Sequence, residues 1–235
     1  NEGKPEVALV YGELLIDILK KGQDRRQLAL ALINLNLAHR TLGNLSEASK
    51  HYYEALKIFE AINRKDDLAA TYAQEASLLM LEGQYPQSIN EYLQSLGIYK
   101  EIHDTLMTNY IRVNLGETYR LFEKFDSAVY YSQQALNNNN DDNEMVKSYA
   151  SGNLGMVCYV LDKPDSAQIL LEQAIDILEP LGDVYSVAVY QFELGKVLVS
   201  QGNIEEGQVK MLNAYQVVLD EGLKEQVRDF SKHLS

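Results

Sequence analysis

The most informative stretch of the chain, residues 114–135, reads NLGETYRLFEKFDSAVYYSQQA. Residues 153–174 read NLGMVCYVLDKPDSAQILLEQA and follow the same scheme 39 residues later. Both stretches begin with Asn-Leu-Gly, carry Asp-Ser-Ala in the middle and end on alanine. A recurrence of this kind, with a period in the range of roughly 20–50 residues, is typical of solenoids built from repeated structural units.

The repeat extends along most of the chain. Turn positions recur about every 40 residues, at Gly43, Gly83, Glu123, Asp162 and Gly202. Small residues recur before and after each turn, with Asn36 as the single exception among fifteen positions: Asn36, Ala76, Gly116, Gly155 and Gly195; Ala48, Ser88, Ala128, Ala167 and Gly207; Ala55, Ser95, Ala135, Ala174 and Ala214. Helices that pack closely require small side chains where their backbones approach, so this pattern predicts antiparallel helix hairpins.

We therefore predict an all-α fold, a right-handed α-solenoid of helix hairpins that forms one array over residues 1–235. The expected units are a half repeat at 1–21, full repeats at 24–63, 64–103, 104–141, 142–181 and 182–221, and a truncated half repeat at 222–235. Acidic residues that cap a helix or occupy its first turn are expected at Asp24, Asp66, Asp104, Asp142 and Asp183. The last segment has apolar residues at helical spacing, Leu223, Val227, Phe230 and Leu234. This face is expected to require a partner, so the natural protein is expected to continue past residue 235.

The repeat resembles the tetratricopeptide signature, most closely at Asn114-Leu115-Gly116, Tyr119, Phe125, Ala128 and Ala135. The resemblance covers nearly the whole chain, although the period of about 40 residues exceeds the roughly 34 of the usual repeat. Longer repeats of this kind are similar to those of kinesin light chains, G-protein-linked spindle adaptors and bacterial peptide-sensing regulators. The chain departs from the signature at Asn36, Glu75 and Pro164, where a small, an apolar and an aromatic residue are usual.

Composition and charge exclude several classes of function. The chain has 34 acidic and 21 basic residues, a net charge of −13, which disfavours nucleic acid and anionic membrane surfaces as partners of this region. A single cysteine, Cys158, fits a reducing compartment, so we expect a cytoplasmic protein. The four histidines lack metal-ligand spacing, and neither a phosphate-binding loop nor a nucleophile with a base is present. The prediction is a protein that is not an enzyme and has no metal or cofactor.

A ladder of polar residues marks the candidate binding surface. The resemblance implies that the first helix of each hairpin lines a concave surface that receives ligands. Two residues before the small position on that helix stand Asn34, Gln74, Asn114, Asn153 and Glu193. A carboxamide both donates and accepts hydrogen bonds, so it can pair with the N–H and C=O of a peptide backbone. Related families use an asparagine at this place in that way.

Other residues on the same face are candidates as well. Arg40 and Arg120 have the forked geometry that suits a ligand carboxylate, Tyr149 offers an aromatic anchor, and Lys196 a positive charge. The alternative is structural: amides on this face can bond neighbouring helices or water, and the tyrosines can be packing residues between repeats. Sixteen tyrosines in a chain without tryptophan favour a structural role for many of them.

The expected function is a scaffold that binds a protein or peptide, gripping an extended peptide in the concave groove. Helix starts with Asp-Ser-Ala, at residues 126–128 and 165–167, resemble those of bacterial arrays. The resemblance implies the sensing or interaction region of a larger bacterial signalling protein. The alternative function is a structural array that mediates self-association as a homo-oligomer, or docks an attached output domain such as a kinase, a nucleotide cyclase or a DNA-binding module, without a separate ligand.

Overall fold

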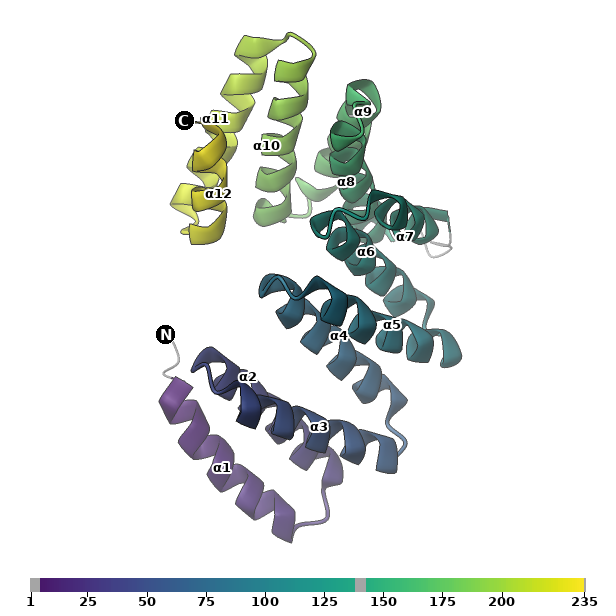
Figure 1. Cartoon of the computed structure of the whole chain (residues 1–235), viewed down its shortest axis with the longest axis vertical. Helices are drawn as coiled ribbons and strands as arrows, with labels where there is room; N and C mark the ends of the chain where they lie inside the picture. The colour runs from purple at the N-terminus through teal and green to yellow at the C-terminus, as the bar shows by residue number, and fades with distance from the viewer. Residues whose placement is uncertain (1–4, 138–142, 235) are drawn as a thin grey trace.

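The computed structural model describes residues 5–137 and 143–234, which form α-helices joined by short turns. The helices are α1 (Pro5–Lys21), α2 (Arg25–Thr41), α3 (Leu45–Ala61), α4 (Lys65–Leu81), α5 (Tyr85–Glu101), α6 (Thr105–Leu121), α7 (Phe125–Asn137), α8 (Glu144–Val160), α9 (Pro164–Leu178), α10 (Val184–Ser200), α11 (Ile204–Asp220) and α12 (Lys224–Leu234). They follow one another as antiparallel neighbours along a C-shaped curve, with α1 and α12 at its two arms (Figure 1). The predicted all-α solenoid of helix hairpins is confirmed.

The turns inside the hairpins share one backbone conformation. Each passes through a residue with positive φ, at Gly43, Gly83, Glu123, Asp162 and Gly202. This conformation lets the N–H that follows bond back into the preceding helix, as Asn44 N does with His39 O at 2.8 Å. Glycine adopts it without steric cost, whereas Glu123 and Asp162 hold φ values of +58° and +57° against the preference of residues that carry a Cβ.

Capping residues fix where the first helices of the hairpins begin. Asp24, Asp104 and Asp183 each accept a hydrogen bond from the backbone N–H three residues later, so the predicted caps of α2, α6 and α10 are confirmed. Asp66 lies in the first turn of α4, where a carboxylate favours the positive end of the helix dipole. Asp142 lies outside the described residues, and Asn143 caps α8 instead, its Oδ1 accepting from Val146 N at 3.0 Å.

The small residues lie where the two helices of a hairpin touch. A Cβ built on Gly195 of α10 would come within 2.7 Å of the backbone oxygen of Gly207 in α11 and 2.5 Å of Met211 Cγ. Asn36 occupies the same register in α2 but is accommodated, because its buried Nδ2 donates to Ala48 O of α3 at 3.0 Å. The hairpins thus differ in how closely their helices approach.

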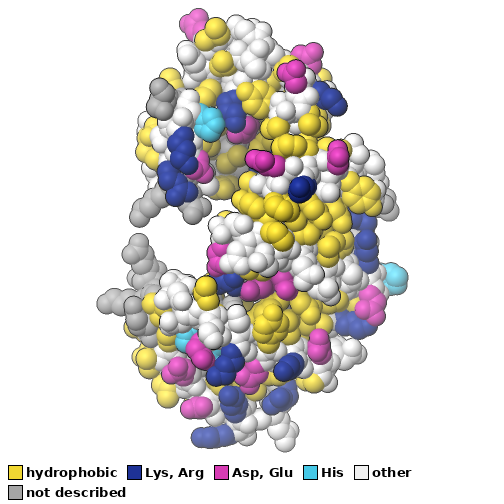
Figure 2. All heavy atoms as spheres, viewed as in Figure 1, with side chains coloured by type: hydrophobic (Ala, Val, Ile, Leu, Met, Phe, Trp, Pro, Cys, Tyr) yellow, Lys and Arg dark blue, Asp and Glu magenta, His cyan; other side chains and the backbone are white. Residues whose placement is uncertain are grey.

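The first helices of the hairpins form an inner layer. Helix α4 contacts α6, α6 contacts α8 and α8 contacts α10, in addition to the contacts between consecutive helices. The second helices, α3, α5, α7, α9 and α11, lie on the other side of this layer (Figure 1). Side chains leave an open space between the two arms of the curve, as the space-filling view shows (Figure 2). The concave surface is therefore built by α2, α4, α6, α8 and α10.

The two ends of the array differ in the apolar surface that they expose. The expectation that the last segment needs a partner for Leu223, Val227 and Phe230 is corrected by the structure, because these residues pack on α10 and α11. The ring of Phe230 stacks on Phe192 with centroids 3.9 Å apart. The side chain of Leu234 lies outside the described residues. Helix α1, by contrast, buries Ile16 against its neighbours and exposes apolar residues along its other face, Val7, Val10, Tyr11, Leu14, Leu15 and Ile18.

Within the ranges that the structure describes, no helix has both the length and the apolar character needed to span a membrane.

Candidate functional site

A cavity of about 210 Å³ opens on the concave surface where α6, α8 and α10 meet. Four of the eight predicted binding residues line it, Asn114 and Arg120 from α6 and Asn153 and Tyr149 from α8. The remaining lining comes from the same three helices: Tyr110, Val113 and Glu117; Met156; Tyr185, Ser186, Val189 and Tyr190. The repeat register therefore brings predicted residues from two repeats into one space, beside residues of a third.

The members of the polar ladder lie in different environments. Asn34 and Gln74 are exposed on α2 and α4 and lie outside the cavity. Asn153 is buried, and its Nδ2 donates to Val113 O of α6 at 3.2 Å, so its donor group holds two helices together. Glu193, the acidic member of the ladder, pairs with Lys196 at 2.7 Å. Asn114 is half-buried in the cavity wall and is the ladder amide best placed to meet a ligand.

The two candidate arginines lie in very different surroundings. Arg40 bonds Glu75 and Glu82, with its closest contact to each at 2.6 Å. The hydrogen bonds that Arg40 donates to Glu82 raise the pKa of Arg40, although burial opposes this shift. Arg120 lines the cavity, and no carboxylate of the described residues forms an ion pair with it. Its Nε is buried without a hydrogen-bond partner.

Tyr149 and Lys196 already have partners within the chain. Burial and a hydrogen bond to Asp183, 2.8 Å from the Tyr149 hydroxyl, raise the pKa of Tyr149. Burial opposes the ionisation of Asp183, but hydrogen bonds from Ser186 and Tyr149 prevail and lower its pKa. The same carboxylate caps α10, so the Tyr149 hydroxyl links α8 to the start of α10. Lys196 lies outside the cavity, with its Nζ 5.5 Å from the centroid of the Tyr159 ring.

Sequence reasoning missed Tyr190, whose buried side chain closes one wall of the cavity. Its ring packs on Gly152 of α8, where an added Cβ would lie 2.6 Å from the Tyr190 hydroxyl oxygen. Burial raises the pKa of this hydroxyl. The signal was present in the sequence, because Gly152 stands where the other repeats have Ile33, Ala73, Val113 and Phe192. A glycine on this face indicates that a large side chain from a neighbouring helix occupies the space.

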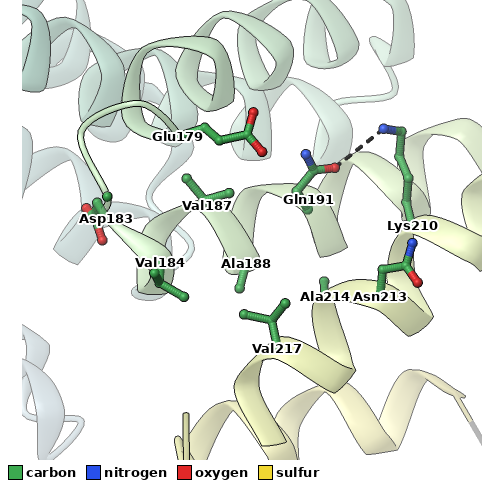
Figure 3. A pocket seen from close by; sticks show the side chains of 11 residues that line it. Glu179, Asp183, Val184, Val187, Ala188, Gln191, Lys210, Asn213, Ala214 and Val217 are labelled. Atoms are coloured by element: carbon green, nitrogen blue, oxygen red, sulfur yellow. Dashed lines mark hydrogen bonds between the residues drawn. The ribbon is translucent and has the colours of Figure 1, made fainter. Parts of the chain in front are cut away.

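A larger cavity, of about 430 Å³, lies on the side of α10 that faces α9 and α11 (Figure 3). Its floor consists of short apolar side chains from α10 and α11, including Val187, Ala188 and Ala214. Lys210 points toward Gln191 and donates to its Oε1 at 3.4 Å (Figure 3). None of the predicted binding residues lines this cavity. We place the candidate site in the concave cavity despite its smaller volume, because the unpaired Arg120 and the amide of Asn114 converge there.

Groups suited to metal binding or nucleophilic chemistry are not assembled around this site. In the described part of the chain, no three His, Cys, Asp or Glu side chains are placed to hold a metal ion. Cys158 is half-buried and burial raises the pKa of its thiol, which disfavours the reactive thiolate. The cavity is thus equipped for hydrogen bonding and charge pairing.

Comparison with known proteins identifies the repeat. Residues 67–141 match the tetratricopeptide repeat family model, so the predicted type of repeat is confirmed. A search of curated protein sequences found no match to the chain.

Solved structures share the fold. The chain is similar to BtubC (BKLC) from P. vanneervenii, with a TM-score of 0.79 and 20% identity over 94% of this chain and 93% of that one. It is also similar to the apo form of RapI, with a TM-score of 0.73 and 16% identity over 92% of this chain and 62% of that one. A Rap protein complexed with Competence and Sporulation Factor gives a TM-score of 0.71 and 14% identity, over 93% of this chain and 61% of that one. The chain thus spans about three fifths of the length of the two Rap proteins.

Proposed function

Because residues 67–141 are tetratricopeptide repeats and similar hairpins flank them, we propose that this chain is an interaction scaffold that binds an extended polypeptide segment on its concave surface. One observation carries the proposal: α6 directs Asn114 and Arg120, and α8 directs Tyr149, toward one cavity on that surface, which α10 closes on its other side. The chain holds a polypeptide and performs no chemistry on it. In this proposal the array is the sensing or interaction region of a larger bacterial signalling protein in the cytoplasm.

The size of the cavity favours part of a long ligand over a whole small molecule. Pockets that enclose small molecules typically exceed roughly 300 Å³, whereas this cavity measures about 210 Å³. That volume suits one or two side chains of a segment whose remainder lies along the open groove. The amide of Asn114 offers a donor and an acceptor to the backbone of such a segment, and Tyr185 and Tyr190 offer apolar surface. The similarity to a Rap protein complexed with Competence and Sporulation Factor supports a ligand on this type of array.

The test is a peptide-display selection against the chain, followed by binding measurements on Asn114→Ala. Loss of an amide that pairs with a desolvated backbone weakens binding by about 1 kcal/mol or more, so we expect a fall in affinity of about fivefold or greater. Asn34→Ala and Gln74→Ala are matched controls, because they remove ladder amides outside the cavity and are expected to leave binding unchanged. Asn153→Ala is less suitable, since it also removes the bond to Val113 O.

A selection that yields no binders contradicts the proposal. Binders that lose affinity equally with all three single substitutions would place the ligand along the whole ladder, and binders unaffected by Asn114→Ala would place it elsewhere on the chain.

The exposed face of α1 favours the second candidate function, self-association. Val10, Leu14 and Ile18 follow one another at helical spacing on this face, with exposed fractions of 57%, 55% and 67%. A continuous apolar stripe of this kind is typical of an interface. In the self-associated form two copies of the chain pack α1 against α1, which leaves the concave cavity free.

Light scattering distinguishes the two functions. The double substitution Leu14→Glu, Ile18→Glu is expected to convert a dimer to a monomer without changing the affinity of selected peptides. A chain that is monomeric at all concentrations up to about 100 μM would contradict self-association, since the free energy of dimerisation would then be weaker than about −5.5 kcal/mol.

A further inference from the structure

The two arginines of the concave surface occupy the same position in their repeats. Arg40 lies three residues before the turn residue Gly43, and Arg120 lies three residues before Glu123. Both are at the end of a first helix, α2 in one case and α6 in the other. A difference in their environment therefore comes from the neighbouring repeat and not from their own helix.

The next repeat neutralises Arg40. Glu75 of α4 lies 2.6 Å from its Nη1, and Glu82, at the end of α4, bonds its Nε at 2.6 Å and its Nη2 at 3.1 Å. The side chains of Arg40 and Glu75 are only 11% and 12% exposed. Two carboxylates thus occupy the donors of one guanidinium, and no ligand is needed to complete its bonding.

The next repeat provides no such partners to Arg120. In register, the residues that correspond to Glu75 and Glu82 are Leu154 and Leu161. Glu117, one turn earlier on α6, also lines the cavity but forms no ion pair with Arg120 in the described structure. The buried Nε of Arg120 is left without an acceptor. A buried donor without a partner costs about 1–3 kcal/mol, which an incoming acceptor recovers.

We propose that Arg120 receives a carboxylate of the bound polypeptide, either an acidic side chain or the C-terminus. This inference rests on the proposed function and specifies the ligand. The guanidinium offers a planar fork of donors that matches a carboxylate at two points. Tyr190 and Asn114 form the surrounding wall of the cavity.

The charges around Arg120 limit the ligand to a single carboxylate. Glu117 lines the same cavity and repels a second negative charge, and its oxygens accept a backbone N–H or a basic side chain of the ligand instead. The net charge of −13 acts in the same direction on approach, because it disfavours a polyacidic segment. The preferred ligand is a neutral or basic segment that contains one acidic group.

The experiment measures selected peptides by fluorescence anisotropy against the wild-type chain, R120Q, R120K and R40Q. R120Q is expected to weaken the binding of a peptide with one carboxylate by about 10- to 100-fold, the loss that corresponds to a charged hydrogen-bonded pair. R120K keeps the charge but loses the forked geometry, so its affinity is expected to lie between those of the wild-type chain and R120Q. R40Q is the matched control, in which affinity stays unchanged while the melting temperature, followed by circular dichroism, falls.

Two changes in the peptide identify the source of the carboxylate. Replacing its acidic residue by the corresponding amide, or amidating its C-terminus, is expected to reproduce the loss seen with R120Q in one of the two cases. The same change is then expected to cause no further loss of affinity when the peptide is measured against R120Q. Peptides that bind wild-type chain and R120Q equally, or whose carboxylates prove dispensable, would overturn the assignment while leaving the proposed function intact.

A small probe tests Arg120 without any selected peptide. In a ¹⁵N-labelled chain titrated with acetate, the Nε–H signal of Arg120 is expected to shift with saturation, whereas that of Arg40 stays in place because its carboxylates are already bound. If no peptide binds the wild-type chain, the proposed function fails; a saturable shift at Arg120 then still supports a carboxylate site. An Arg120 signal that does not respond to acetate overturns the inference.

Discussion

The N-terminal and C-terminal halves of the array differ in the side chains that hold one hairpin against the next. Between hairpins α2–α3 and α4–α5 the junction is polar: Arg26 pairs with Asp67 at 2.7 Å, Arg40 pairs with Glu75 and Glu82, and the Tyr52 hydroxyl donates to Glu91 at 2.6 Å. Between α8–α9 and α10–α11 the junction is mainly apolar, with Leu171, Ile175, Tyr190 and Leu194 in one buried cluster. One repeat pattern therefore gives a junction whose polar groups pair with one another in the N-terminal half and a mainly apolar junction in the C-terminal half.

The two halves also differ in the spacing of the two helices within a hairpin, and a substitution that tests this spacing is expected to have the largest effect. Gly195→Asn places in α10 the residue that α2 carries at Asn36, but the added side chain meets Gly207 O and Met211. Because backbone has to move, we expect the free energy of unfolding to fall by at least about 3 kcal/mol, measured by chemical denaturation.

The reverse change is the control for helix spacing. Asn36→Gly in α2 loses one hydrogen bond and leaves a small void, so the expected loss is about 1–2 kcal/mol. Equal losses from the two substitutions would contradict the difference in helix approach.

The polar junction predicts a second difference, between the two arginines. Arg40→Gln leaves Glu75 nearly buried without its cation, and we expect a loss of about 2 kcal/mol in the free energy of unfolding. Arg120→Gln removes an arginine with no ion-pair partner in the described structure together with its unpaired buried Nε–H, so we expect the free energy of unfolding to stay unchanged or to rise by about 1 kcal/mol. The melting temperatures of both variants, measured by thermal denaturation, test this difference. A larger loss of stability in Arg120→Gln than in Arg40→Gln would show that Arg120 has an essential structural role.

Acid is expected to loosen the polar junction first. A hydrogen bond from Arg26 lowers the pKa of Asp67, and one from Arg40 lowers the pKa of Glu82. A carboxylate with a depressed folded-state pKa stabilises the fold above its unfolded-state value of about 4, and this contribution is lost as pH falls through the folded-state value. We therefore expect the hydrogen-exchange protection factors of α2–α5 to fall below about pH 4 before those of α8–α11 do.

Glu91 acts in the opposite direction, and a variant isolates the acid effect. Burial raises the pKa of Glu91, so its protonation on acidification is favoured in the folded state and partly offsets the loss. The double substitution Asp67→Asn, Glu82→Gln removes these two carboxylates of the polar junction and is expected to reduce the pH dependence of its stability below pH 4. A pH dependence that persists in this variant would assign the acid sensitivity to other groups.

The turns provide the smallest expected effect. Glu123 holds a positive φ of +58° where three other repeats have glycine, so Glu123→Gly relieves the cost of a Cβ in this conformation. The gain is reduced by the greater freedom of glycine in the unfolded chain, and we expect a net stabilisation of about 0.5–1 kcal/mol by chemical denaturation. The reverse substitution Gly83→Ala is expected to destabilise the fold by a similar amount. A loss of stability with Glu123→Gly would show that the Glu123 side chain stabilises its turn.

Much of the fold could be predicted from local pattern, because the relevant interactions lie within a few residues. The Asp caps of α2, α6 and α10 act on the N–H three residues later, and the turns depend on single residues with positive φ. The packing and hydrogen-bond partners of the predicted binding residues could not be predicted in this way, because they lie far away in the sequence. Asn153 was predicted as a ligand contact, but its Nδ2 reaches Val113 O, 40 residues earlier in the chain. The sequence pattern of residues 222–235 shows an apolar face but no partner for it, whereas in the structure Phe230 stacks on Phe192 of α10.

The repeat pattern alone is enough to predict the hairpins and the register that places Asn114, Arg120, Asn153 and Tyr149 on one surface. Which of these side chains remain available to a ligand depends on how the repeats pack, since Arg40 and Arg120 occupy the same position in their own helices. The physical reason is that their partners are provided by the adjacent repeat, 35 to 42 residues later for Arg40, where Glu75 and Glu82 occupy the positions that Leu154 and Leu161 hold beside Arg120. Whether a charge in a repeat protein is paired depends on the contact between repeats, and that contact follows from the packing of the helices.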